Sequence, residues 1–179
     1  MKLFPPFKAI LPVYALIVFL TYGWSLAVTF WKIPSWLLYM SLGDLAIAFC
    51  YIFVVNFVES AIFLIGLLGL GLILPARFLR NRFSAGGVLL ALLLPASAML
   101  HMALYANADL RDAFILSLPV WWFGTVILAA IGLWLTVRFE FLENVLTGLA
   151  ERMIVFLYLF LPLTLVALVV VIGRNLWLA

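Results

Sequence analysis

The chain has 179 residues, of which 69% are hydrophobic and 9% charged, and its formal net charge is +3. A soluble domain is on average about 45–50% apolar and about 25% charged, so this composition excludes a soluble globular protein and makes lipid the solvent. Only helices and closed barrels span a bilayer, and the apolar runs here are continuous rather than alternating. The sequence therefore predicts an all-α, polytopic transmembrane helix bundle.

The N-terminal segment is basic and then apolar, as in a signal peptide. Its apolar part covers residues 9–30, which exceeds the roughly 7–15 residues of a cleavable hydrophobic core. We therefore expect an uncleaved first span. Trp31, Lys32 and Pro34 then indicate a turn at the membrane interface.

The next segment, residues 37–75, contains no Lys or Arg. A spanning helix needs roughly 20 residues, so this segment fits either of two arrangements. It forms two short spans that turn near Asn56, or an interfacial piece followed by one long span. The chain accordingly has five spans, or alternatively six.

Three further spans are predicted at residues 84–106, 114–137 and 153–172. Between the last two, residues 138–152 place apolar side chains at helical spacing on one face and Glu140, Glu143 and Asn144 on the other. This pattern is typical of a short amphipathic interfacial helix, although a helical extension of a flanking span fits equally well. We predict a single transmembrane domain over residues 1–179.

The distribution of Lys and Arg favours five spans with a cytoplasmic N-terminus. In that topology seven of the ten basic residues are inside and three outside. Six spans with the N-terminus outside place six inside and four outside. The basic charge thus reports topology rather than nucleic-acid binding, and the compact loops favour a bacterial cytoplasmic (inner) membrane. The inside set for five spans is Lys2, Lys8, Arg77, Arg80, Arg82, Arg138 and Arg152.

Two acids lie in the oily stretch SLGDLAIAFCYIFVVNFVES, Asp44 and Glu59. A charge at the bilayer centre costs about 3 kcal/mol on insertion scales. A hairpin topology buries Asp44, and a five-span topology buries Glu59. Either acid could belong to an ion or proton path or contact a partner subunit; the simpler alternative is an interfacial or internally hydrogen-bonded acid.

His101 is the only histidine, and Cys50 is the only cysteine. His101 could carry protons or be the axial ligand of a haem or pigment, whereas a packed histidine is the simpler interpretation. A metal site needs several ligands, so we predict none, and no cofactor is required by the sequence.

The cluster Arg77, Arg80 and Arg82, together with Arg138 and Arg152, is suited to contact anionic lipid head groups. Topology alone also explains these residues. Gly66, Gly69 and Gly71 predict close helix packing.

Motifs of phosphate-binding loops, nucleophile elbows and zinc hydrolases are absent from the sequence. We therefore predict a non-catalytic integral membrane subunit that packs within a larger complex of membrane proteins. One alternative is a small transporter or channel that uses Asp44, Glu59 and His101. Another alternative is an intramembrane or lipid-modifying enzyme. It would need at least two residues of a set of five to converge in a pocket, namely Asp44, Glu59, His101, Arg111 and Asp112.

The four residues LYAN, Leu104–Asn107, precede a short polar loop. Together with the order of the spans, they resemble the membrane part of lipoteichoic-acid-synthase-type phosphotransferases. The resemblance implies a further alternative, in which the chain is the membrane partner of an exported or lipid-modifying enzyme.

Overall fold

A computed structural model describes residues 5–75, 79, 82–105 and 111–178 of the chain. Over these residues it has five helices and no strand: α1 (Phe7–Trp36), α2 (Leu42–Ile73), α3 (Phe83–Tyr105), α4 (Arg111–Arg138) and α5 (Glu140–Leu178). Each helix is long and apolar enough to cross a membrane. The protein is therefore a multi-pass membrane protein, and the prediction of an all-α bundle is confirmed.

The segment 37–75 contains one helix and not a hairpin, which overturns the six-span alternative. Helix α2 starts after the cap residue Ser41 and continues without interruption to Ile73, so Asn56 lies inside it rather than at a turn. At 1.5 Å per residue α2 is about 48 Å long, whereas the hydrocarbon core is about 30 Å thick. Tilting or extension beyond the interface accommodates the difference.

The amphipathic segment 138–152 does not form a separate helix. Helix α4 ends at Arg138, and after Phe139 the chain starts α5 at Glu140, which then runs for 39 residues. The amphipathic residues form the first turns of this helix. The alternative interpretation, a helical extension of a span, is the one found in the structure.

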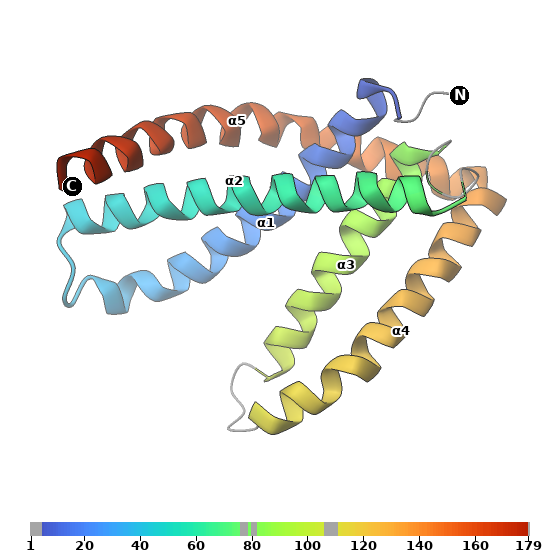
Figure 1. Cartoon of the computed structure of the whole chain (residues 1–179), viewed down its shortest axis with the longest axis horizontal. Helices are drawn as coiled ribbons and strands as arrows, with labels where there is room; N and C mark the ends of the chain where they lie inside the picture. Colours follow the sequence, from blue (N-terminus) through green and yellow to red (C-terminus); the bar gives the residue numbers. More distant parts are fainter. Residues whose placement is uncertain (1–4, 76–78, 80–81, 106–110, 179) are drawn as a thin grey trace.

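Helices α1, α2 and α5 lie together, and α3 and α4 form a hairpin that joins them at one end (Figure 1). We call this the closed end; α3 begins there and α4 ends there. Toward the opposite, open end the hairpin diverges from the other three helices, and the last turns of α5 lie beside the α1–α2 connection (Figure 1). Buried residues of all five helices form one core: Val13, Leu16, Ile17, Leu67, Phe83, Val88, Leu90, Ala91, Ala129, Leu133, Leu146 and Ala150.

A second cluster holds α1, α2 and α5 together. The hydroxyl of Tyr22 lies 2.7 Å from Thr164 Oγ1 of α5 and donates to the carbonyl of Phe53 in α2 at 3.2 Å. The Tyr22 ring stacks on Phe160, with ring centroids 4.7 Å apart. A buried hydrogen bond of this kind helps to fix helix partners in an apolar medium.

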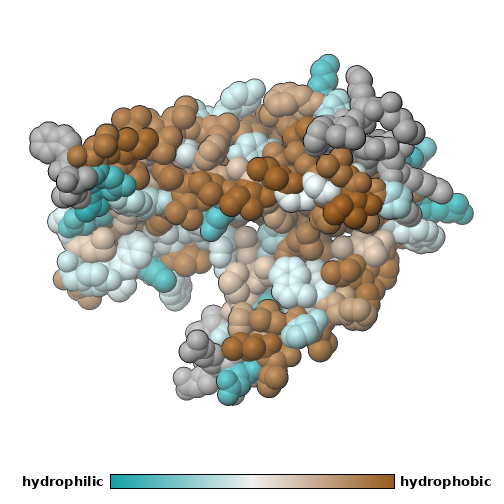
Figure 2. All heavy atoms as spheres, in the orientation of Figure 1, coloured by the Kyte–Doolittle hydropathy of each residue, from teal (hydrophilic) through white to brown (hydrophobic). Residues whose placement is uncertain are grey.

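The surface is hydrophobic over much of the length of the helices, and hydrophilic residues gather mainly toward the helix ends (Figure 2). Side chains on the outer faces of α2 and α4 are largely exposed, among them Ile62 and Val120. Lipid or other membrane proteins cover such faces.

Candidate functional site

A polar groove lies between α1 and α2. Its volume is about 320 Å³, and it is lined by Trp24, Ser25, Val28, Thr29, Tyr51, Ile52, Val55, Asn56 and Glu59. Four of these residues come from α1 and five from α2. Among the cavities of the described structure this one is notable for combining a carboxylate with a primary amide within an apolar span.

Glu59 is exposed near the middle of α2. At 1.5 Å per residue it lies about 25 Å from Leu42 and about 21 Å from Ile73, so it is near the middle of this candidate span. Its neighbours Val55 and Ile62 are 51% and 63% exposed. In the described part of the chain no hydrogen bond or ion pair involves its carboxylate. Glu59 thus lies on an exposed face of α2, outward from the bundle.

Asn56 lies one helical turn before Glu59 and is only 2% exposed. Its Oδ1 accepts a hydrogen bond from Ser25 Oγ at 2.7 Å, and its Nδ2 has no partner. If the amide is flipped, Nδ2 bonds to Ser25 and Oδ1 becomes the unpaired atom. In either orientation one buried polar atom is unsatisfied, which costs about 1–3 kcal/mol.

Asp44 belongs to the start of α2 and not to the groove. Its backbone N–H donates to Ser41 Oγ at 3.2 Å, and its Oδ2 accepts from the Ser41 N–H at 3.3 Å. This is a reciprocal capping box, which satisfies N–H groups that a helix start leaves free. Asp44 also lines a separate depression with Arg174 of α5. Its position thus agrees with an interfacial acid.

His101 is buried inside the α3–α4 hairpin and is 2% exposed. Its Nε2 lies 2.9 Å from Ser117 Oγ, whose hydroxyl can also donate to the carbonyl of Phe114. Whether Nε2 or Ser117 Oγ donates depends on the tautomer of His101. The rings of Tyr105, Phe114 and Trp121 surround it at centroid distances of 4.7–5.1 Å. His101 thus has the environment of a packed histidine.

The structure does not bring Asp44, Glu59 and His101 together. Glu59 lines the α1–α2 groove, Asp44 lines the depression near Arg174, and His101 lies in the hairpin. No hydrogen bond joins any two of them, nor any of them to Asp112, within the described ranges. In those ranges there is also no group of three side chains suited to hold a metal. The side chain of Arg111 lies outside the described part.

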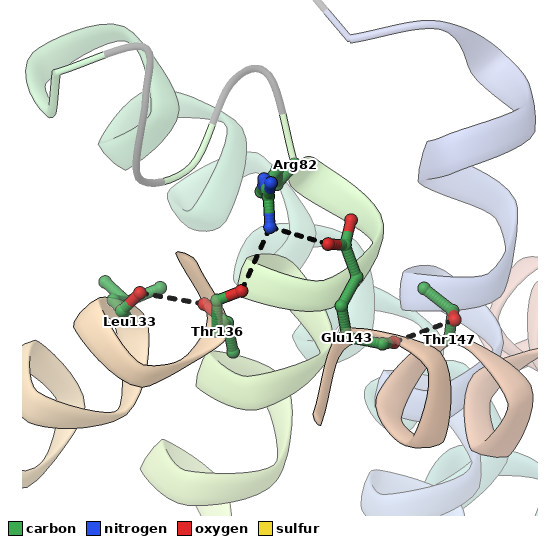
Figure 3. Close-up of polar contacts among 5 residues, drawn as sticks. All are labelled: Arg82, Leu133, Thr136, Glu143 and Thr147. Atoms are coloured by element: carbon green, nitrogen blue, oxygen red, sulfur yellow. Dashed lines mark hydrogen bonds and ion pairs between the residues drawn. The ribbon is translucent and has the colours of Figure 1, made fainter. Parts of the chain in front are cut away.

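Arg82 connects three segments at the closed end (Figure 3). Its Nη1 donates to Glu143 Oε2 at 2.6 Å and to the carbonyl of Thr136 at 3.1 Å. The Thr136 carbonyl is in the last turn of α4, where helices lack internal donors. Arg82 thus ties the start of α3 to the end of α4 and the start of α5.

The other arginines expected at lipid head groups are only partly described. Arg138 and Arg152 are exposed, as a head-group contact requires. Arg77 and Arg80 lie outside the described residues. Because Arg82 is bound within the protein, it is less free for lipid than the sequence suggested.

A second groove, of about 590 Å³, lies between α3 and α4. It is mainly apolar, and its polar side chains bond to one another. Ser97 Oγ lies 2.6 Å from Thr125 Oγ1, and Trp121 Nε1 donates to Ser97 Oγ at 2.8 Å. This groove therefore presents little unsatisfied polar chemistry.

The residues around Glu59 also carry a signal in the sequence. A turn near Asn56 was one of two alternatives for residues 37–75, and the structure places Asn56 inside α2, where it faces Ser25 of α1. Their spacing was the available signal: Ser25 and Thr29 are four residues apart in α1, and Asn56 and Glu59 are three apart in α2. Residues at these spacings share a helix face. A comparison with known protein families, curated proteins and solved structures finds no match.

Proposed function

We propose that the chain is a non-catalytic integral membrane subunit that packs within a larger complex of membrane proteins. The observation that supports this proposal is Glu59, an outward-facing carboxylate near the middle of a spanning helix, without a partner in the described structure.

The physical argument concerns the cost of such a residue. An acid at the bilayer centre costs about 3 kcal/mol on insertion scales, and intramembrane ionisable residues almost always face other protein or water. The Glu59 side chain is too short to reach the head groups, which lie about 15 Å from the centre. A second membrane protein against α2 removes this cost by pairing the carboxylate.

A transporter or an enzyme has less support from the geometry. A path through Asp44, Glu59 and His101 requires a common cavity, and these side chains lie in three places. An active site requires convergence of groups, and Asp44 and His101 are each engaged in a structural role.

The location proposed for the subunit is a bacterial cytoplasmic membrane, with the N-terminus in the cytoplasm. With five spans, seven basic residues are inside and three outside. Alkaline phosphatase fused after Trp36 should be active and a fusion after Arg138 inactive; the reverse pattern would refute this orientation.

The composition of the native particle tests the subunit proposal. The tagged chain is released from its own membrane into lipid nanodiscs and weighed by native mass spectrometry. We expect a reproducible stoichiometric assembly with at least one other membrane protein. A particle that contains only this chain, alone or as a homo-oligomer, would refute the proposal.

A further inference from the structure

We infer that the α1–α2 groove receives a transmembrane helix of another protein that carries a Lys or Arg at mid-membrane depth. The cationic group binds the Glu59 carboxylate. This inference rests on the proposed subunit function and specifies the chemistry of the partner.

The charge of the groove determines the kind of partner. An ionised carboxylate only accepts hydrogen bonds, and the strongest donors to it are the cationic groups of Arg and Lys. In the described chain the ion pair at the closed end uses Arg82 and Glu143, and Glu59 has no such counterpart. A cation brought by a neighbouring helix supplies it.

The small side chains at the floor of the groove allow a helix to approach closely. Ser25 and Thr29 are small side chains of α1, and small residues allow helices to approach closely. Asn56, beside Glu59, has one unsatisfied polar atom. The Nδ2 atom is fully buried, however, so it lies beneath the surface that an incoming helix meets, and recognition depends on Glu59.

A second copy of this chain does not provide the cation. All ten Lys and Arg residues flank the apolar spans rather than interrupt them at their centre. The two described cations at the ends of α1, Lys8 and Lys32, illustrate this placement. Lipid head groups are too distant to supply the cation, because they lie about 15 Å from the bilayer centre. A metal ion is excluded as well, because the described residues of the groove lack the three ligands that it needs.

Photo-crosslinking in the native membrane tests the inference. A benzophenone amino acid replaces Val55, which is 51% exposed and lines the groove. The control position is Val126 of α4, which is 59% exposed and does not line it. We expect the Val55 probe to label a span of another protein with Lys or Arg in its middle third, and the Val126 probe not to label that span.

Charge variants separate specific recognition from proximity. Glu59→Gln should lower the crosslink yield about tenfold, equivalent to about 1.4 kcal/mol, and Glu140→Gln, at an exposed glutamate outside the groove, should leave it unchanged. Glu59→Lys should abolish the crosslink, and an acid in place of the partner's cation should restore it.

Three outcomes overturn the inference: a labelled span without a central cation, a label on a second copy of this chain, or a wild-type yield with Glu59→Gln. If a partner still co-purifies in any of these cases, only the inference fails and the subunit proposal stands. If no other protein co-purifies, the subunit proposal fails as well. Monodisperse elution of each variant shows that it has folded.

Discussion

Replacing Gly87 with alanine tests the packing that joins α3 to α1 at the closed end. A Cβ at this position would lie 3.1 Å from Val13 Cγ2 and 3.3 Å from Val13 Cγ1. Val13 is fully buried, and a β-branched side chain in a helix has one strongly preferred rotamer. Rotation therefore cannot move both methyl groups away, so the helices must separate slightly.

The expected magnitude follows from two opposing effects. Overpacking of this kind costs about 1–3 kcal/mol, whereas Gly→Ala inside a helix contributes about 0.8–1 kcal/mol of propensity. The difference leaves a net loss of about 0–2 kcal/mol in the free energy of unfolding for Gly87→Ala, so we predict that this variant is about 1–3 kcal/mol less stable than one with a glycine-to-alanine change that meets no neighbour. At Gly132 the new Cβ would lie even closer, 2.7 Å from Leu89 Cδ2. Leu89 is half-buried and the contact is with its mobile end, so we expect Gly132→Ala to stay within about 1 kcal/mol of wild type.

The measurement is reversible unfolding in mixed micelles with increasing SDS, followed by tryptophan fluorescence. The matched control is Gly66→Ala, because a Cβ there would meet nothing within 4 Å. The expected order of stability is Gly66→Ala, then Gly132→Ala, then Gly87→Ala. If Gly87→Ala matches the Gly66 control, α3 and α1 are not in the close contact described. If Gly132→Ala lowers the stability most, the loss depends more on how close the new Cβ lies to its neighbour than on how freely the neighbouring side chain can move.

Three further changes test the local structure by the same unfolding titration or by hydrogen exchange. Arg82→Ala should lower the free energy of unfolding by about 1–2 kcal/mol, which is more than Glu143→Gln should. A partly exposed ion pair contributes less than about 1 kcal/mol, and only Arg82 also donates to a helix-end carbonyl. Equal losses for the two variants would contradict this. Ser41→Ala should speed amide exchange in the first turn of α2 by about fivefold, from the loss of about 1 kcal/mol of capping; unchanged exchange would refute the cap. Asn56→Leu should leave the isolated chain within about 1 kcal/mol of wild type, since an unpaired amide is removed. A larger loss of stability would show that Asn56 stabilises the fold.

The helices follow from the sequence because lipid leaves the backbone little choice. Continuous apolar runs must form helices to satisfy their backbone groups, and the basic residues alone favoured five spans over six. The capping box at Ser41 and Asp44 was also legible, since a Ser followed three residues later by an acid before an apolar run is a known signature.

Packing was harder to predict, and the glycines show why. The run Gly66, Gly69 and Gly71 suggested close contact, yet a Cβ at either of the first two would meet nothing within 4 Å, and at Gly71 it would meet only Leu79 at ordinary distance. Close approach occurs instead at Gly87 and Gly132. Composition does not reveal which face of a helix meets a neighbour when all faces are apolar, because the lipid-facing and protein-facing sides then look alike.

The α1–α2 groove differs from the rest of the described bundle in how its polar side chains are paired. A sequence folds consistently when local preferences agree with the structure, and departures tend to mark functional sites. In most of the described bundle polar side chains are paired: Tyr22 with Thr164, Arg82 with Glu143, and the histidine of the hairpin with a serine. Glu59 and Asn56 depart from this rule within one turn of the same helix. Of the two, only Glu59 is exposed, and an exposed carboxylate near the middle of a spanning helix, without a partner in the described structure, is better explained by a missing partner than by tolerance of a costly charge.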